Sequence, residues 1–265
     1  MIKIELKTLK HDKKVGMKCE NIKPNITEDT MFLENGKVIG FYIRDMSKYS
    51  KTANQLADIA DKELRSNRVP KTEMRRSSGL LEQNKDKEVR QYSTILGGVA
   101  PKPHMRRDYP SVSSVHGVKT AQTFVKAMVM LAKESENIIK DLMPEQYEIQ
   151  KKLIEEYCPK KYRFTDLFTS SISNFNISAN YHVDNANIKG CVNVIIAKRK
   201  DSTGGNTNVP DYDATIDSCD NSMLVYPAWR NLHGVTPIIP TASGGYRNTL
   251  VFYPLSGFKK YVEKQ

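Results

Sequence analysis

The chain has 265 residues, which is long enough to bury one large core without disulfide bridges. Its formal net charge of +11 and isoelectric point near 9.3 favour a polyanionic partner such as nucleic acid; the alternative is a lysine-rich solvated surface. Its four cysteines form no Cys-x-x-Cys pair, and neither a secretory signal nor a membrane-spanning run is found, so we expect a cytoplasmic protein.

The first 90 residues are predicted to form a hairpin, a helix and a basic loop. Asn35-Gly36 lies between two apolar runs and predicts a two-residue turn in a β-hairpin over residues 31–43. An apolar stripe of helical period predicts a helix over residues 52–64. The polar, basic stretch 66–90 is predicted to be a loop that orders only against a polyanion.

Residues 91–160 are predicted to supply helical support. Ile95-Leu96-Gly97-Gly98 is interpreted as the opening of a second basic loop, which continues through residues 102–107, where prolines exclude a helix. An amphipathic pattern predicts a long helix over residues 118–142. Pro144 suits the first turn of another helix that runs to about Tyr157.

Residues 161–265 read mainly as short strands separated by turn signals. The predicted strands cover residues 168–177, 181–184, 192–197, 223–226, 235–239 and 249–253. Short strands at even spacing predict a sandwich or jelly roll. We therefore expect an α+β fold in one domain (residues 1–265), with a double-stranded β-helix (cupin-like) core over 161–265, flanked by N-terminal and central helices.

Two histidines and one aspartate in this last region form a candidate metal site. His182 and Asp184 are two residues apart on a predicted strand, which places both side chains on one face and points Val183 the other way. His233 opens a later strand and completes a set that can occupy three adjacent corners of an octahedral metal. Arg247, fourteen residues further on, can grip a carboxylate at two points. We interpret the set as an Fe(II) and 2-oxoglutarate site.

Two other interpretations of these residues stay open. The histidines can be ordinary strand or turn residues and Arg247 a surface cation. A structural zinc site is the weaker alternative, because no cysteine completes a closed tetrahedron.

Several motifs resemble those of the TET/JBP-type dioxygenases, in particular the compact phage-type members. They are His182-Val183-Asp184, Gly204-Gly205, Val209-Pro210, His233-Gly234-Val235-Thr236-Pro237 and the run from Arg247 to Tyr253. The similarity covers about residues 162–255, with no TET-like cysteine-rich domain. If the chain is phage-encoded, the expected location is the host cytoplasm.

The resemblance implies a role for each matching position. His182, Asp184 and His233 would bind Fe(II), and Arg247 would pair with the distal carboxylate of 2-oxoglutarate, with Thr249 adding a hydroxyl. Tyr253 matches the aromatic against which a flipped pyrimidine stacks, and Asn187 matches a polar contact to the base edge; the competing interpretations are a core tyrosine and a turn cap. The family often has a histidine where this chain has Leu255, so the accepted base is an open question.

The expected activity is oxidation, with O2 and 2-oxoglutarate, of the 5-methyl group of a flipped pyrimidine in DNA, either 5-methylcytosine or thymine. The basic loops over residues 68–76 and 102–107 are predicted to hold the DNA backbone, with Arg106 and Arg107 as candidate contacts to phosphate or to 2-oxoglutarate. The alternatives are a 2-oxoglutarate oxygenase with another substrate, such as a protein hydroxylase or a nucleic-acid demethylase, and a non-enzymatic basic nucleic-acid-binding protein.

Overall fold

A computed structural model describes residues 1–73, 90–102 and 107–262. Its helices are α1 (Lys51–Arg65), α3 (Gln122–Leu142) and α4 (Pro144–Tyr157). Short 3₁₀ turns occur elsewhere in the described chain: η1 (Met46–Lys48), η3 (Ser114–Gly117), η4 (Lys119–Ala121), η5 (Lys160–Tyr162), η6 (Pro210–Tyr212) and η7 (Lys259–Tyr261). No helix in these described ranges combines the length and apolar character needed to cross a membrane.

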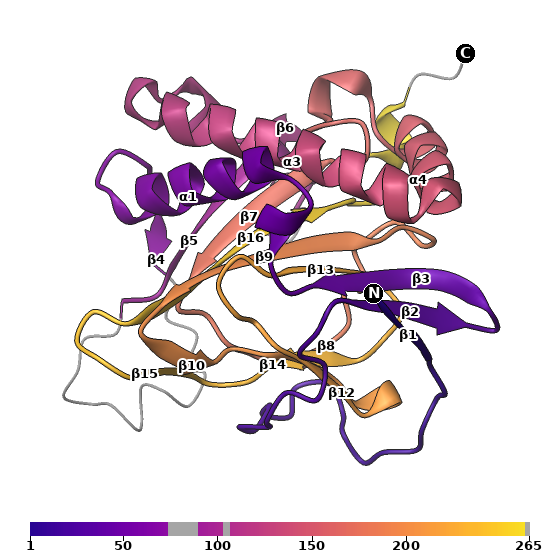
Figure 1. Ribbon diagram of the computed structural model, residues 1–265. Helices are drawn as coiled ribbons and strands as arrows, with labels where there is room; N and C mark the ends of the chain where they lie inside the picture. The colour runs from indigo at the N-terminus through magenta and orange to yellow at the C-terminus, as the bar shows by residue number, and fades with distance from the viewer. Residues whose placement is uncertain (74–89, 103–106, 263–265) are drawn as a thin grey trace.

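Two facing sheets form the body of the molecule. A ten-stranded sheet has the order β1-β2-β3-β13-β9-β16-β7-β5-β4, with β6 paired to β5, and a four-stranded sheet has the order β12-β11-β14-β8. The helices cover the outer face of the large sheet, and the four-stranded sheet faces it from the opposite side (Figure 1). This arrangement confirms the predicted jelly-roll core flanked by helices.

The strands are short, as their spacing in the sequence predicts, and they come from all parts of the chain. Their bounds are β1 (Ile2–Glu5), β2 (Thr30–Glu34), β3 (Lys37–Ile43), β4 (Thr72–Glu73), β5 (Tyr92–Val99), β6 (Ser111–Val112), β7 (Ser170–Phe175), β8 (Ala179–His182), β9 (Asn193–Lys200), β10 (Ser202–Gly204), β11 (Thr207–Val209), β12 (Ala214–Ile216), β13 (Met223–Tyr226), β14 (His233–Val235), β15 (Ile238–Pro240) and β16 (Tyr246–Tyr253). Strands β10 and β15 form a separate antiparallel pair.

The hairpin and the helices form where the sequence predicts them. Asn35 and Gly36 both have positive φ (51° and 73°), as a two-residue type I′ turn between β2 and β3 requires. Ser50 caps the N-terminus of helix α1, because its Oγ accepts a hydrogen bond from the Ala53 amide at 3.0 Å. Its buried residues recur at helical spacing and pack with α3 against the large sheet.

Strand β5 replaces the loop that we expected at Ile95 to Gly98. It pairs with β7 over six residues, and its glycines lie where the neighbouring chain comes very close. A Cβ on Gly97 would lie 2.7 Å from the Thr169 carbonyl oxygen, and one on Gly98 would lie 2.5 Å from the carbonyl oxygen of Tyr162. The glycines are therefore close-approach positions inside a strand and not a turn signal.

The expected single strand over residues 235–239 is also wrong, because β14 ends at Val235 and β15 begins at Ile238. Pro237 lies between them and has no amide hydrogen to donate to a sheet. Strand β8 ends at His182, two residues before the end that we predicted, so Asp184 lies in the following loop. Most of the basic stretch 66–90 lies outside the described residues.

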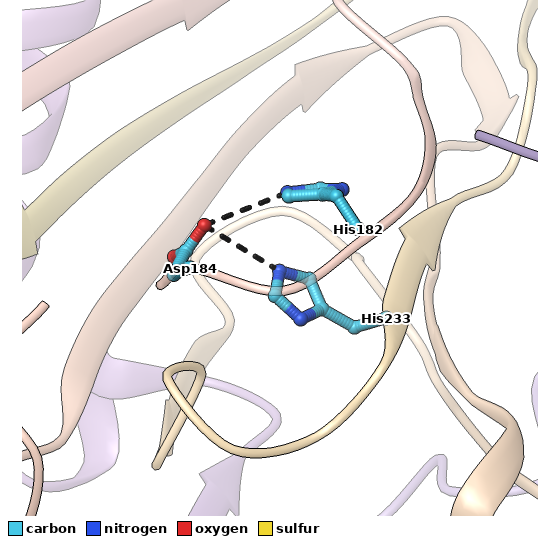
Figure 2. Close-up of side chains that lie close together, drawn as sticks. All are labelled: His182, Asp184 and His233. Atoms are coloured by element: carbon cyan, nitrogen blue, oxygen red, sulfur yellow. Dashed lines mark ion pairs between the residues drawn. The ribbon is translucent and has the colours of Figure 1, made fainter. Parts of the chain in front are cut away.

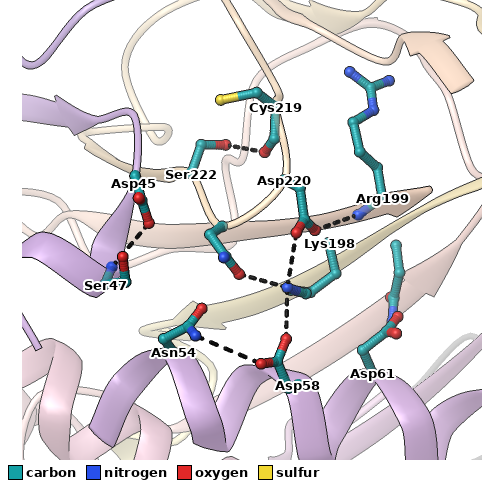
Figure 3. Close-up of polar contacts among 12 residues, drawn as sticks. Asp45, Ser47, Asn54, Asp58, Asp61, Lys198, Arg199, Cys219, Asp220 and Ser222 are labelled. Atoms are coloured by element: carbon teal, nitrogen blue, oxygen red, sulfur yellow. Dashed lines mark hydrogen bonds and ion pairs between the residues drawn. The ribbon is translucent and has the colours of Figure 1, made fainter. Parts of the chain in front are cut away.

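A buried lysine ties helix α1 to the large sheet. Lys198 on β9 is 5% exposed, and its Nζ lies 2.7 Å from Asp58 Oδ1 of α1 and 3.1 Å from Asp220 Oδ2 (Figure 3). It also donates a hydrogen bond to the Asn221 side chain. Because both aspartates are about half exposed, this network joins a buried cation to solvated anions at the edge of the helix layer.

Replacing this lysine tests the tie. We expect Lys198→Ala to lower the free energy of unfolding by about 1 to 2 kcal/mol, because two ion pairs between α1 and the sheet are lost. Lys200→Ala, an exposed neighbour on the same strand, serves as control and should change it by less than about 0.5 kcal/mol. Urea unfolding of both variants measures the difference; equal stabilities would contradict a specific role for Lys198.

Candidate active site

The two histidines of the candidate metal site are direct partners in the small sheet. His182 at the end of β8 pairs with His233 at the start of β14, and their rings lie 4.3 Å apart between centroids. Asp184 reaches the same point from the loop after β8, where its amide donates to the Ala228 carbonyl oxygen at 3.1 Å. Its Oδ1 lies 3.6 Å from His182 Nε2 and 3.9 Å from His233 Nε2 (Figure 2).

The hydrogen bonds around these side chains leave one atom of each free for a metal. The Nδ1 atoms of His182 and His233 donate to the carbonyl oxygens of Asn180 (2.7 Å) and Asn231 (3.0 Å), so each Nε2 carries the lone pair. Asp184 Oδ2 accepts a hydrogen bond from Asn193 Nδ2 at 2.9 Å, which leaves Oδ1 facing the two nitrogens. The three ligand atoms lie within 4.8 Å of one another.

This donor set suits a divalent transition metal with open positions. Two imidazole nitrogens and one carboxylate oxygen occupy three positions and leave the others to cosubstrates, as in non-haem Fe(II) oxygenase sites. Burial lowers the pKa of His233, with a further lowering from His182, so this imidazole is neutral and able to bind metal at neutral pH. The residues present therefore fit Fe(II).

A cavity of about 520 Å³ between the two sheets joins the metal site to β16. Residues 247, 249, 251 and 253 of β16 all line it, because alternate side chains of a strand share one face. The intervening Leu250 and Phe252 point into the helix-side core. We call this space the intersheet cavity; its volume lies in the usual range for small-ligand sites.

Arg247 is a buried cation on the wall of this cavity. It is 3% exposed, and no acidic group in the described part of the chain lies within 4.0 Å of its guanidinium. Its Nε donates to Ser218 Oγ at 3.0 Å, and Gly205 packs so closely that an added Cβ would lie 3.0 Å from its Cδ. Desolvation and the nearby Arg199 lower the pKa of Arg247 to about 9. A carboxylate entering the cavity would relieve this cost.

The other predicted site residues are placed as follows. Thr249, Asn187 and Tyr253 line the intersheet cavity, as does Leu255. Asn187 Nδ2 donates to Asn193 Oδ1 at 2.8 Å, so its amide group supports the residue that holds Asp184. Val183 also lines the cavity and does not point away into apolar packing, because the chain leaves the strand after His182.

Arg107, a candidate arginine of the second basic loop, is not among the residues that line this cavity. Arg107 donates to the Ala100 carbonyl oxygen at 2.5 Å and to Ser111 Oγ at 3.3 Å, which ties its guanidinium to its own loop. Arg106 lies outside the described residues.

Asn193 and Ser218 are site residues that we did not predict from the sequence. Asn193 carries a detectable signal, since it is a polar residue in the otherwise apolar run from Val192 to Ala197. Ser218 carries none, because it lies in the connection between β12 and β13, far from Arg247 in the sequence.

Comparison with solved structures places this geometry in a known fold. No protein-family model and no curated protein matches the sequence. NgTET1, solved in complex with 5mC DNA, superposes with a TM-score of 0.60 at 13% identity, covering 96% of this chain and 88% of that one. This chain has the fold of NgTET1. A 2OG-Fe(II) oxygenase family oxidoreductase from Burkholderia pseudomallei (TM-score 0.41, 13% identity, 75% and 77% coverage) and a full-length Neurospora crassa protein in complex with alpha-KG (0.41, 10%, 81% and 74%) are more distant.

Asn193 provides a test of how Asp184 is held. We expect Asn193→Ala to weaken Fe(II) binding by about 10- to 100-fold, because Asp184 loses the hydrogen bond that orients its free oxygen toward the histidines. Asn174→Ala removes a similar amide from the cavity wall on β7 without a bond to Asp184, and serves as control. Equilibrium dialysis measures both; equal affinities would show that Asn193 does not orient the ligand.

Arg247 provides a second test, which separates its effect on binding from its effect on folding. We expect Arg247→Met to raise the dissociation constant of 2-oxoglutarate about 100-fold, since a buried charge pair is lost. Without 2-oxoglutarate the variant should be at least as stable as the wild type, because a buried cation without a counterion has been removed. Arg230→Met is the control, because the Arg230 guanidinium is already paired with Glu34. Isothermal titration measures the dissociation constant of 2-oxoglutarate, and thermal melting without 2-oxoglutarate measures stability.

Proposed function

We propose that this protein is a dioxygenase dependent on Fe(II), 2-oxoglutarate and O2, and that the whole chain acts as one catalytic domain. The observation that carries the proposal is the meeting, in one cavity, of a three-ligand metal set and a buried arginine that has no acidic partner among the residues the structure describes. Taken separately, the metal-ligand set and the buried arginine are each explained by a role in stabilising the fold. Together they match a cosubstrate with a metal-chelating end and a distal carboxylate.

The proposed substrate is the 5-methyl group of a pyrimidine in DNA, 5-methylcytosine or thymine. Three observations support it: the net charge of +11, the motifs that resemble the TET/JBP-type enzymes, and a fold shared with NgTET1, which was solved with 5mC DNA. A base cannot reach a cavity between two sheets while it is stacked in a duplex, so the nucleotide must be flipped out. Tyr253 and Asn187 are then the proposed contacts to the base.

In this mechanism the chain positions the reactants and excludes water. Bound Fe(II), with 2-oxoglutarate and O2, supplies the chemistry that converts a methyl group to hydroxymethyl and releases succinate and carbon dioxide. Arg247 holds the distal carboxylate, with Thr249 beside it on the same strand face. His182, Asp184 and His233 keep the metal at the opposite end, and the aromatic ring of Tyr253 orients the base so that its methyl group faces the metal.

Mass spectrometry of nucleosides tests the substrate directly. Incubation with Fe(II), 2-oxoglutarate and either 5-methylcytosine DNA or unmodified thymine DNA should yield a hydroxymethyl nucleoside from one of them, with matching succinate. RNA and peptide substrates are assayed in parallel. Oxidation of RNA or peptide but not DNA would contradict the DNA proposal, while the absence of succinate with every substrate would contradict the enzymatic one.

Substitution of the metal ligands tests the site independently of the substrate. We expect His182→Ala and Asp184→Ala to abolish both Fe(II) retention and succinate formation, since two ligands cannot hold the metal in an oxygenase geometry. Asp141→Ala is the control, because Asp141 is exposed on α3, on the helix side of the large sheet. Turnover retained by either ligand variant would show that the metal is bound elsewhere.

A further inference from the structure

The N-terminal segment passes along the small sheet and touches the strand that carries His182. We call residues 9–26 the N-terminal strap. It is fixed at one end by the Leu9 amide, which donates to the Asp211 carbonyl oxygen at 2.7 Å, and at the other by a bridge between Ile26 and Ile216. Between these points Cys19 is buried against Gly234, the residue after His233. The strap therefore lies directly behind the metal-binding strands.

Midway along the strap, the turn Lys14–Met17 is hydrogen-bonded to the edge of β8. The Gly16 amide donates to the Tyr181 carbonyl oxygen at 2.8 Å, and the Tyr181 amide donates to the Met17 carbonyl oxygen at 2.8 Å. Asn180 Nδ2 adds a third bond, to the Gly16 carbonyl oxygen at 3.1 Å. His182 is the next residue of β8, and its side chain is 41% exposed. The turn is thus held along the edge of β8, one residue from the metal ligand His182.

This turn is positively charged and has an apolar tip. The sequence from Lys7 to Lys18 contains five lysines and one acidic residue, Asp12. In the described ranges, neither Lys14 nor Lys18 has an acidic group within 4.0 Å, and both are exposed. Val15, at the tip between them, is 69% exposed. Unpaired cations around an exposed apolar side chain complement a phosphate backbone and the bases beside it.

Three of the described cations that we expected to hold DNA are engaged within the protein instead. Arg68 forms two hydrogen bonds with Glu63, at 2.9 and 2.6 Å. Lys71 donates to the Ser66 carbonyl oxygen and lies over the ring of Tyr92. Arg107 is bonded to its own loop, as described above. Lys14 and Lys18 differ from these cations, because no salt bridge to them is found within the described ranges and their turn is bonded to Tyr181, the residue before His182.

We propose that the strap turn is a DNA-contacting element: Lys14 and Lys18 contact phosphates next to the target nucleotide, and Val15 packs against the bases that remain when that nucleotide enters the intersheet cavity. This inference rests on the proposed function and adds to it the surface that holds the duplex. Apolar side chains inserted at a base step help to offset the loss of stacking.

The charge contribution is tested by the salt dependence of binding to a duplex with one 5-methylcytosine. We expect Lys14→Ala/Lys18→Ala to weaken binding about tenfold and to reduce the slope of log K against log salt by about 1.8, which is about 0.9 for each lost phosphate contact. Lys126→Ala/Lys133→Ala is the control, because these exposed lysines lie on α3, on the helix side of the large sheet. An unchanged slope in the strap variant, or an equal change in both double variants, would overturn the proposal.

The role of the tip is tested by a substrate that is easier to flip. Val15→Ser should lower kcat/KM about threefold more on a matched duplex than on one whose target base is mismatched, because the mismatched base needs less help to leave the stack. Equal loss on both duplexes would remove the tip from the proposal. If the wild type does not oxidise DNA at all, the proposed function fails; if it does and the strap variants match it, only this inference fails.

Discussion

The alternation of side chains along β16 is the constraint on which the rest of the structure depends. This strand pairs with β9 on one side and β7 on the other, so its backbone cannot rotate or slip. A shift by one residue would exchange Arg247 for Asn248 and bury the cation in the helix-side core. Asp61 of α1 opposes such a shift, because it accepts hydrogen bonds from the side chains of Tyr246 (2.8 Å) and Asn248 (3.0 Å).

The two ends of the site therefore come from two sheets that are fixed separately. The metal ligands depend on the pairing of β8 with β14, which places His182 opposite His233. Arg247 depends on the register of the large sheet. The distance between them is set by the packing of the two sheets, and a cosubstrate that binds both must match that distance. A rigid separation of this kind selects for ligand length as well as for charge.

Strand periodicity and a family pattern together single out the histidines, Asp184, Arg247 and Thr249, and the structure brings all five side chains to one cavity. The strands that carry such residues were predicted less completely. Strand β5 was missed, since glycines needed for close approach look the same in a sequence as glycines of a turn. Ser218 was missed because its contact with Arg247 exists only after folding. Local sequence patterns predict secondary structure and the chemistry available to a side chain, while the tertiary contacts that bring distant residues together are not visible in them.

The two roles that we propose for positive charge in this molecule are separated by burial. Arg247 is almost fully buried, so a single carboxylate gains a large interaction there and water competes poorly. The strap lysines are exposed, so each contributes little and its contribution is screened by salt. Such lysines attract any polyanion and cannot choose a base. If the substrate is DNA, the choice between cytosine and thymine must therefore lie in the cavity wall, where Asn187 bridges to Leu255 near Tyr253.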